Sequence, residues 1–181
     1  MSLATHCGTH IDAPAHFFKE GMTVENIPLS QLHGPALVLD LTGRASRERI
    51  EWSDIACHEE ALRNAAIMGG IVLLRTGWSE YWGTEKYFDH PFLDESVAKK
   101  FVEIGIKTIG IDAFSPDETV HTTAYPEFPV HSIVLGAGMV IGENLANLED
   151  IQDGSWVVCL APLRLDKGDG SPVRAYAVRI G

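Results

Sequence analysis

Four side chains near the start of the chain have the types and spacing of a metal or catalytic site. Three histidines and one aspartate fall within eleven residues: His6, His10, Asp12 and His16. Imidazole nitrogens combined with a carboxylate oxygen suit a divalent ion such as Zn²⁺ or Mn²⁺. An imidazole is also the side chain best suited to moving protons near neutral pH.

The spacing of these four residues favours an extended chain over a helix. In a helix, which turns by about 100° per residue, Asp12 would point far from His6 and His10. Gly8 and Pro14 also disfavour a helix. In an extended chain all four candidates occupy even positions and therefore share one face. We therefore expect a strand-like segment that presents the four side chains to one side.

Structural interpretations of this segment remain open from the pattern alone. Single histidines are more often packed or exposed than catalytic, and two histidines four residues apart occur by chance. A purification-tag remnant is another alternative, but Gly8-Thr9 and Ala13-Pro14 between the histidines are not typical of a tag. Three histidines and an aspartate on one face favour a metal or catalytic site.

Such a site needs residues from elsewhere in the chain, because ligands from one strand rarely surround an ion. His131 precedes an apolar run, and Glu143 follows the next one. The glycine-rich segment 136–138 predicts a strand-turn-strand path that returns Glu143 to the level of His131. An edge histidine and a helix-capping glutamate are the structural alternatives. The other histidines have no such neighbours and are expected at the surface or in the core: His33, His58, His90 and His121.

Helix and strand signals alternate between these two groups of candidates. Apolar runs predict strands over 36–41, 71–75 and 108–112. Helices are expected over 53–68 and 94–104, each opened by a capping side chain and ended by glycine. This alternation is typical of an α/β domain.

Strands dominate the last part of the chain. Segments 155–165 and 173–180 are expected to pair across a turn at 167–170. Residues 76–89 form an aromatic loop, and 113–130 form a long irregular stretch of the kind that often carries function. We therefore predict a mixed β-sheet with helices on one side.

Composition places the chain among ordinary globular proteins. Its 181 residues fit one domain, 1–181, and 45% hydrophobic with 22% charged residues exclude a disordered chain. No apolar run approaches the 18 or so residues that cross a bilayer. A net charge of −11 without a basic cluster argues against nucleic-acid and membrane partners. With three cysteines and no visible signal peptide, we expect a cytoplasmic protein with reduced thiols.

The motif His-x-Gly-Thr-His-x-Asp-x-Pro-x-His over 6–16 resembles the signature of a known family. This is the cyclase family of metal-dependent hydrolases, which includes bacterial kynurenine formamidase and isatin hydrolase. Further similar segments follow in order along nearly the whole chain: 73–78, 129–131, 135–138, 141–145, 162–164 and 170–175. The resemblance implies a mixed β/α sandwich of the swivelling-domain kind, assembled as a homodimer or homotetramer.

The resemblance also implies a role for each metal-ligating candidate. His6, His10 and Asp12 would bind one ion. Asp12 would bridge to a second ion held by His131 and Glu143. The family includes one-metal and two-metal members that use Zn²⁺ or Mn²⁺, so one or two ions per chain are expected.

The implied reaction is hydrolysis of an amide or cyclic amide, such as an arylformamide, by metal-activated water. His16 would be the general acid/base rather than a ligand. Tryptophan catabolism is the best-known pathway of such enzymes. Aromatic side chains are expected to wall the pocket around an aryl substrate, with core packing as the alternative. These candidates are Phe17, Phe18, Trp78, Tyr81 and Trp82.

One departure from the family pattern concerns the first motif, which starts at His6. Family members carry a longer segment before it, which supplies a first strand and a loop over the active site. The alternative function is therefore a metal-binding protein of the same fold without hydrolytic activity. The presence of His16 favours the hydrolase. A cupin-like metal protein fits less well, because its jelly roll needs many more short strands.

Overall fold

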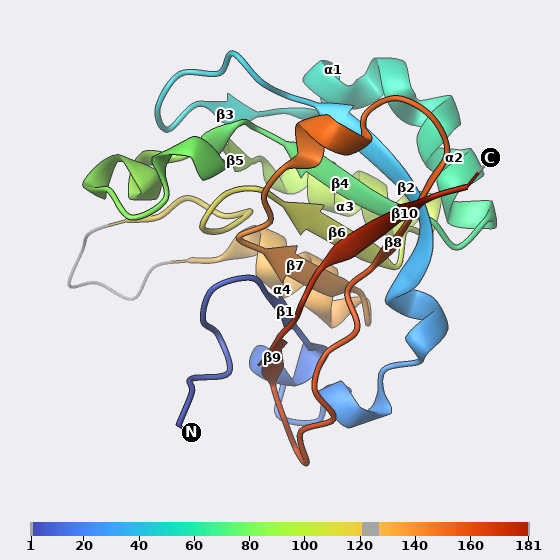
Figure 1. Cartoon of the computed structure of the whole chain (residues 1–181). Coiled ribbons are helices and arrows are strands. Elements are labelled where there is room, and N and C mark those ends of the chain that lie inside the picture. The colour runs from blue at the N-terminus through green and yellow to red at the C-terminus, as the bar shows by residue number, and fades with distance from the viewer. Residues whose placement is uncertain (1, 121–126, 181) are drawn as a thin grey trace.

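The computed structural model describes residues 2–120 and 127–180, and Figure 1 shows their arrangement around a curled sheet. Eight strands of the described residues form that sheet: β1 (His10–Asp12), β2 (His33–Asp40), β4 (Ile71–Arg75), β6 (Thr108–Ile111), β7 (Val140–Glu143), β8 (Trp156–Cys159), β9 (Gly170–Pro172) and β10 (Tyr176–Arg179). Their spatial order is β10-β8-β2-β4-β6-β7-β1-β9. A separate short pair joins β3 (Arg49–Ile50) to β5 (Phe92–Leu93).

The middle of the sheet is parallel and apolar. Strands β2, β4, β6 and β7 run in the same direction, and Ile71–Leu74 of β4 is buried throughout. Continuous apolar runs of this kind are typical of parallel strands covered on both faces. Strands β8 and β1 join the two sides in antiparallel fashion, and β10 and β9 extend them. The sheet is therefore mixed, as the sequence predicts.

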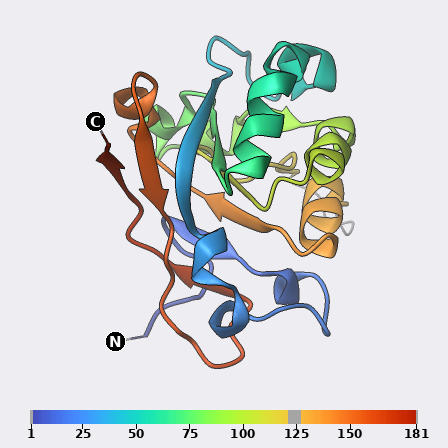
Figure 2. The same ribbon diagram turned by 90° about the vertical axis from the view of Figure 1, so that its right-hand side faces the viewer.

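Four helices of the described chain cover one face of the sheet, as Figure 2 shows for α2, α3 and α4. They are α1 (Trp52–Ile55), α2 (Glu59–Ile67), α3 (Glu95–Ile104) and α4 (Pro129–Gly136). Phe101 and Val134 are fully buried there and share one core with Leu74 and Ile109 of the sheet. This core holds the parallel strands against the helices. The packing therefore fixes the ends of β6 and β7, where the candidate residues lie.

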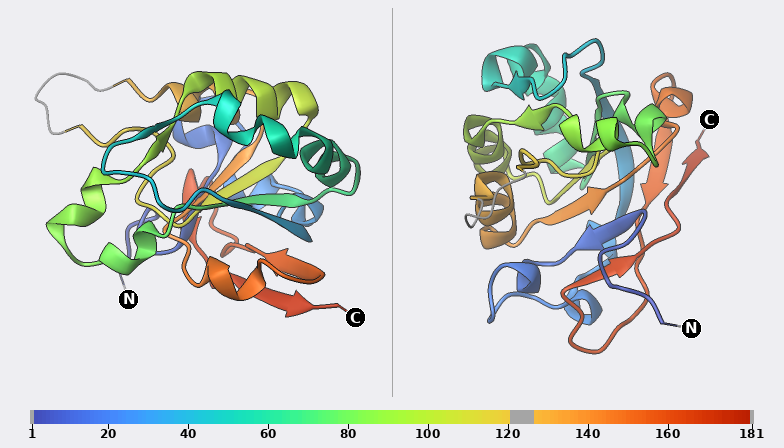
Figure 3. Two further views of the ribbon diagram at one scale, coloured as in Figure 1. Left: turned by 90° about the horizontal axis from the view of Figure 1, so that it is seen from above. Right: turned by 90° about the vertical axis from the view of Figure 1, so that its left-hand side faces the viewer.

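The sheet curls so that its opposite face packs against strands from its own edge. Ile71, Leu73 and Val140 share a second core with Val158 and Leu160. Figure 3 shows β8 and β10 on this side, away from the helices. The curl brings β9 alongside β1, so that residues near position 170 approach the N-terminal motif.

Helix α3 matches the predicted boundaries. Asp94 accepts a hydrogen bond from the backbone N of Ser96, and Gly105 ends the helix in the left-handed conformation. Both features are the capping signals that the sequence carries. The single helix expected over 53–68 is instead interrupted, because His58 leaves the helical conformation between α1 and α2.

The strand predicted before the turn at 136–138 is wrong. Residues 133–135 belong to α4, which has proline at its first position and four buried side chains: Val130, His131, Val134 and Leu135. A short apolar run suits a buried helix as well as a strand, so periodicity alone does not separate them. The path from His131 to Glu143 is therefore helix, turn and β7.

The long stretch predicted as irregular is described at 113–120 and 127–130. Helix α4 begins within it, at Pro129. His121, which was expected at the surface or in the core, lies outside the described residues. Within the described residues, no helix has both the length and the apolarity needed to span a bilayer.

Candidate metal centre

The N-terminal motif bends twice instead of forming one continuous strand. Only the three residues of β1 are extended as a strand, Gly8 has a φ of 58°, and Pro14–His16 forms a 3₁₀ turn. The expected single extended face is therefore wrong. Glycine adopts a positive φ without strain, and proline fixes the start of the turn. These bends bring the rings of His6 and His16 to 4.0 Å between centroids.

Asp12 lies at the centre of the histidine cluster, with 1% of its side chain exposed. Its Oδ1 is 2.6 Å from Nδ1 of His6 and 3.3 Å from Nε2 of His10. Its Oδ2 is 3.3 Å from Nε2 of His131. Burial raises the pKa of Asp12, but hydrogen bonds with these three histidines outweigh burial and hold that pKa well below its usual value. The ionised carboxylate therefore presents both oxygens to the cluster.

Helix α4 and strand β7 supply the second part of the cluster. Strand β1 pairs with β7 so that His10 lies opposite Glu143, whose Oε2 is 3.5 Å from Nε2 of His10. His131 lies in the first turn of α4, and its Nε2 is 3.4 Å from Oε1 of Glu143. Burial raises the pKa of Glu143, and the nearby charge of Asp12 raises it further. All the predicted ligand residues therefore lie together.

Two carboxylates that the sequence analysis did not single out join the cluster from distant segments. Asp117 lies 2.7 Å from Nδ1 of His131, and Asp169 lies 3.3 Å from Nδ1 of His16. Oδ2 of Asp169 is also 3.1 Å from Nε2 of His6. Isolated carboxylates carry no spacing signal, so only the folded chain reveals these two residues.

The two histidines held by these carboxylates differ in their proton affinity. Burial lowers the pKa of His131, but hydrogen bonds with Asp117 and Asp12 and the nearby charge of Glu143 outweigh burial and raise that pKa well above its usual value. Burial also lowers the pKa of His16, and no such set of carboxylates outweighs it within the described residues. His16 is therefore the histidine suited to accept a proton near neutral pH.

The donor atoms fit a divalent ion. Two sets of potential ligand atoms each lie within 4.8 Å of one another. They are His6, Asp12 and His16, and His10, Asp12 and Glu143. Among the described residues, buried Nε2 of His6 and Oε1 of Glu143 lack a hydrogen-bond partner of suitable geometry. Orphaned buried donors and acceptors of this kind fit a site built for a metal, and nitrogen with carboxylate oxygen suits Zn²⁺ or Mn²⁺.

A cavity of about 620 Å³ opens onto this cluster. Aromatic side chains from four separate segments line it: Phe17, Trp82, Tyr87, Phe88, Phe114 and Phe128. Phe17 also stacks on the ring of His131, with centroids 5.1 Å apart and planes inclined by 19°. The cavity therefore joins an apolar wall to the candidate ligands.

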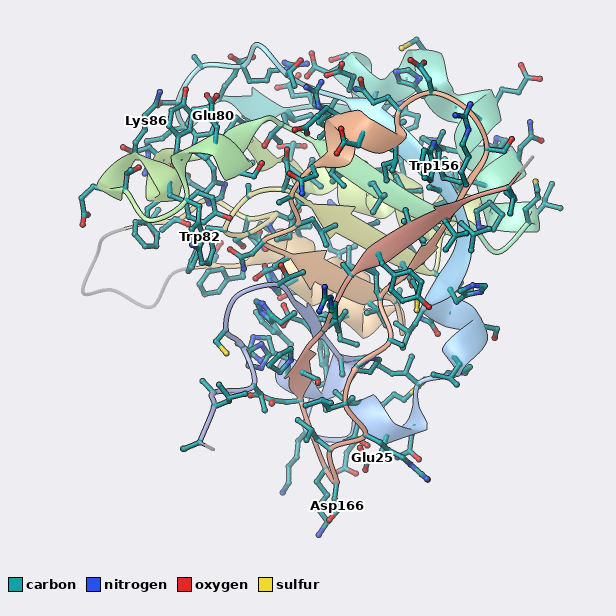
Figure 4. The ribbon with its side chains drawn as sticks, in the orientation of Figure 1. Glu25, Glu80, Trp82, Lys86, Trp156 and Asp166 are labelled. Carbon is teal, nitrogen blue, oxygen red and sulfur yellow. The ribbon has the colours of Figure 1, made fainter. Side chains whose placement is uncertain are left out.

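Of the five predicted pocket residues, the structure places Phe17 and Trp82 at the cavity. Figure 4 shows Trp82 on the side of the aromatic loop that faces the N-terminal segment, opposite Lys86. In the described part of the chain the other three do not line this cavity. Trp78 is buried in the core, Tyr81 lies under Nζ of Lys86 at 3.6 Å, and Phe18 is exposed.

Four of the aromatic lining residues were not predicted from the sequence as pocket residues. Tyr87 and Phe88 lie within the predicted aromatic loop, so that loop was the signal for them. Phe114 follows the carboxyl end of β6, the edge at which open α/β sheets bind ligands. Phe128 precedes α4, and its approach depends on the fold of that helix.

The sequence of this chain is similar to the sequences of known proteins. The sequence profile of a family described as "Putative cyclase" matches residues 1–118. The kynurenine formamidase of Geobacillus thermodenitrificans is 32% identical over 181 residues, which cover 100% of this chain and 79% of the relative.

The fold of this chain is also similar to the folds of solved structures. The isatin hydrolase A of Labrenzia aggregata, bound to benzyl benzoate, superposes with a TM-score of 0.82 and 29% identity, over 97% of this chain and 74% of that one. A potential metal-dependent hydrolase with cyclase activity superposes with a TM-score of 0.76 and 33% identity, over 96% of this chain and 79% of that one.

Proposed function

The chain belongs to the cyclase family, and on that premise we propose that it is a metal-dependent hydrolase of an amide carbon–nitrogen bond. One observation carries the proposal. Asp12 contacts three histidines and shares two of them with Glu143, at the floor of an aromatic cavity. The resemblance seen in the sequence motifs is confirmed by the family profile and by the related structures.

The proposed substrate is an aryl formamide or a fused cyclic amide. Two relatives are named kynurenine formamidase and isatin hydrolase A, and isatin is a cyclic amide. The cavity volume of about 620 Å³ falls within the range of roughly 300 to 1,000 Å³ usual for small-molecule sites. Its aromatic wall suits a flat ring, which supports an aryl substrate.

The residues that would hold the metal divide into two sets around one carboxylate. His6, His10 and Asp12 would hold one ion, and Asp12 with His131 and Glu143 would hold a second. The proposed metal is Zn²⁺ or Mn²⁺, with one or two ions per chain. When bound, such an ion supplies an acidified water molecule and a Lewis acid for the carbonyl oxygen.

His16 is proposed to move the protons of the reaction. Its Nδ1 donates to Asp169, so Nε2 is the ring nitrogen available to take a proton from water and return it to the leaving nitrogen. The lowered pKa of His16 favours the neutral ring that this step needs. Asp169 would keep the ring in this orientation. The alternative, a metal-binding protein without hydrolysis, is not favoured, because His16 lies beside the cluster and lines the cavity.

The cavity wall is held rigid by its own contacts, which favours a fixed substrate position. The hydroxyl of Tyr87 donates to Oδ1 of Asn144 at 2.9 Å, next to Glu143 in the chain. Burial, with the charges of Asp112 and Glu143, raises the pKa of Tyr87 well above its usual value, so the hydroxyl keeps its proton. Trp82 packs edge-on against Tyr87 with centroids 5.2 Å apart. These aromatic rings would orient the substrate and exclude water.

Assembly, location and pathway belong to the same proposal. We infer a homodimer or homotetramer, since edge strand β10 exposes Tyr176 and Val178, and exposed edge strands favour pairing.

All three cysteines lie in the described residues and are free, which supports a cytoplasmic location. No partner beyond a small-molecule amide is proposed. Tryptophan catabolism is the pathway proposed from the resemblance.

Turnover of a panel of amides tests the function. The protein would be loaded with Zn²⁺ or Mn²⁺ and offered N-formylkynurenine, formanilide and isatin, with the His16→Ala variant as the control. Metal-dependent hydrolysis of at least one substrate, lost in the variant, is the expected result. Full metal loading without turnover of any amide would support the alternative function.

A further inference from the structure

We propose that Asp117 is a positioning residue that fixes the ring of His131 and so sets up one side of the metal centre before an ion binds. The inference rests on the proposed function, because His131 matters here as a metal ligand. Asp117 lies in the described segment after β6, and 1% of its surface is exposed. A buried carboxylate is costly unless every acceptor is used, so its partners indicate its role.

Three donors from one helix turn converge on the Asp117 carboxylate. The backbone N of Val130 donates to Oδ1 at 2.9 Å, and the backbone N of His131 donates to Oδ2 at 2.9 Å. Nδ1 of the His131 ring lies 2.7 Å from the same Oδ2. The carboxylate therefore binds both the backbone and the side chain of His131, which restricts the position of the ring and its rotation.

Helix α4 needs this carboxylate because its own start lacks a cap. The residue before the helix, Phe128, makes no side-chain capping hydrogen bond in the described structure, and Pro129 has no N–H to offer. Asp117 supplies the missing acceptor from 14 residues away for His131. The first turn of α4 and the ring that it carries are thus anchored by one side chain.

The hydrogen bond to Asp117 also determines which ring nitrogen of His131 faces the cluster. With Nδ1 donating to the carboxylate, Nε2 points to Oδ2 of Asp12 at 3.3 Å and to Oε1 of Glu143 at 3.4 Å. A carboxylate behind a ligating histidine fixes its tautomer and orientation and makes the ring a stronger ligand.

His10 shows the same arrangement on the other side of the cluster. Its Nδ1 lies 2.9 Å from the carbonyl oxygen of Gly8, and its Nε2 is 3.3 Å from Asp12 and 3.5 Å from Glu143. Both rings are therefore held from behind and face the same two carboxylates. For His10 the backbone provides the support, whereas for His131 it comes from Asp117.

Zinc affinity of the Asp117→Asn variant tests the role. The amide in this variant carries no charge and has one acceptor oxygen instead of two, so it cannot accept from both Val130 N and His131 and it supports the His131 ring less firmly as a ligand. Replacing the partner that holds a ligating histidine from behind reduces metal affinity by about 10- to 100-fold, and we expect a loss of that size in a competition titration with a chelating dye.

The matched control is Val134→Ala, which removes buried volume from α4 and leaves the Asp117 carboxylate in place. We expect it to lower the thermal midpoint but to keep the zinc affinity of the unaltered protein. Equal zinc affinity in Asp117→Asn and the unaltered protein would overturn the positioning role. An equal loss in Val134→Ala would also overturn it, because any weakening of α4 would then suffice.

If Asp117→Asn does not fold, a measurement on the unaltered protein tests the positioning role of Asp117. In zinc-loaded protein labelled with ¹⁵N in histidine, NMR of the ring nitrogens should show His131 protonated at Nδ1 and zinc-bound at Nε2. The reverse assignment would overturn the inference while leaving the hydrolase proposal intact. Failure of the unaltered protein to bind zinc or manganese would instead overturn the proposed function, and the inference with it.

Discussion

Nδ1 of His16 donates a hydrogen bond to Oδ2 of Asp169 at 3.3 Å, across 153 residues of sequence. The same oxygen lies 3.1 Å from Nε2 of His6. One carboxylate beside β9 therefore touches both the proposed proton carrier and a proposed ligand. The hydrogen bond between His16 and Asp169 therefore connects the N-terminal motif to a segment near the end of the chain.

Replacing His16 separates proton transfer from metal binding. If His16 is the general acid/base, His16→Ala should reduce kcat by about 10²- to 10⁴-fold while the metal content stays unchanged. Steady-state kinetics and elemental analysis of the same preparation provide the two values. His33→Ala, which removes an exposed histidine of β2, is the control and should change neither. Loss of metal in His16→Ala would make His16 a ligand, which the 4.8 Å set with His6 and Asp12 also allows.

A side chain at Gly170 should displace the ring of His6, because that ring occupies the space beside the glycine. A Cβ at Gly170 would lie 2.8 Å from Nε2 of His6 and closer still to Cε1. Gly170→Ala should therefore displace the ring and lower metal affinity, as a titration with Mn²⁺ would measure. Gly136→Ala meets only the ring of exposed Phe18 at 3.2 Å and should bind Mn²⁺ normally. Unchanged affinity in Gly170→Ala would show that His6 is not a ligand.

Trp82 is predicted to contribute to substrate binding more than to stability. It is 59% exposed and lines the cavity, so an aryl substrate would cover its ring. Removing an aromatic contact costs about 1 kcal/mol, so Trp82→Ala should raise KM by roughly fivefold with little change in the thermal midpoint. Trp156→Ala, on β8 away from this cavity, is the matched control (Figure 4). A KM equal in both variants would place the substrate elsewhere.

Stability should depend on pH through His90, which lies apart from the metal cluster. Its ring is buried, with Nδ1 2.9 Å from the Pro91 carbonyl oxygen and Nε2 2.8 Å from the Thr119 hydroxyl. Burial lowers the pKa of His90 below its usual value. The unfolded chain therefore binds this proton more readily than the folded chain, and the free energy of unfolding should fall as pH decreases from about 6.5.

Denaturant unfolding at pH values above and below about 6.5 measures this effect. The His90→Asn variant isolates it, because asparagine keeps a donor for the Pro91 carbonyl and does not titrate. The difference in free energy of unfolding between the two proteins should change with pH in this window. A constant difference would rule out a contribution from His90.

Much of the site could be predicted because its residue types and local spacing carry chemical information. His6, His10, Asp12 and His16 lie within one short segment, and β1 and its flanking bends bring them together. The backbone conformation of this segment was harder to predict, because the bend at Gly8 depends on β7 and β9, which pair with β1 from distant parts of the chain.

The sheet and helix α3 were predictable for a similar reason, because β4 is a continuous apolar run and α3 carries its own caps. Helix α4 was not, since a short apolar segment does not distinguish a buried helix from a strand and its start is capped by distant Asp117. Asp169 was equally hidden, because a single carboxylate has no pattern until the chain folds around it.

Metal content per chain tests the central claim most directly. Plasma mass spectrometry of protein purified without chelator should find one or two equivalents of zinc or manganese. Asp12→Ala should lose this metal, because Asp12 touches His6, His10 and His131, whereas exposed Asp166→Ala should retain it. The absence of metal from the unaltered protein, even after reconstitution with Zn²⁺ and Mn²⁺, would contradict the account.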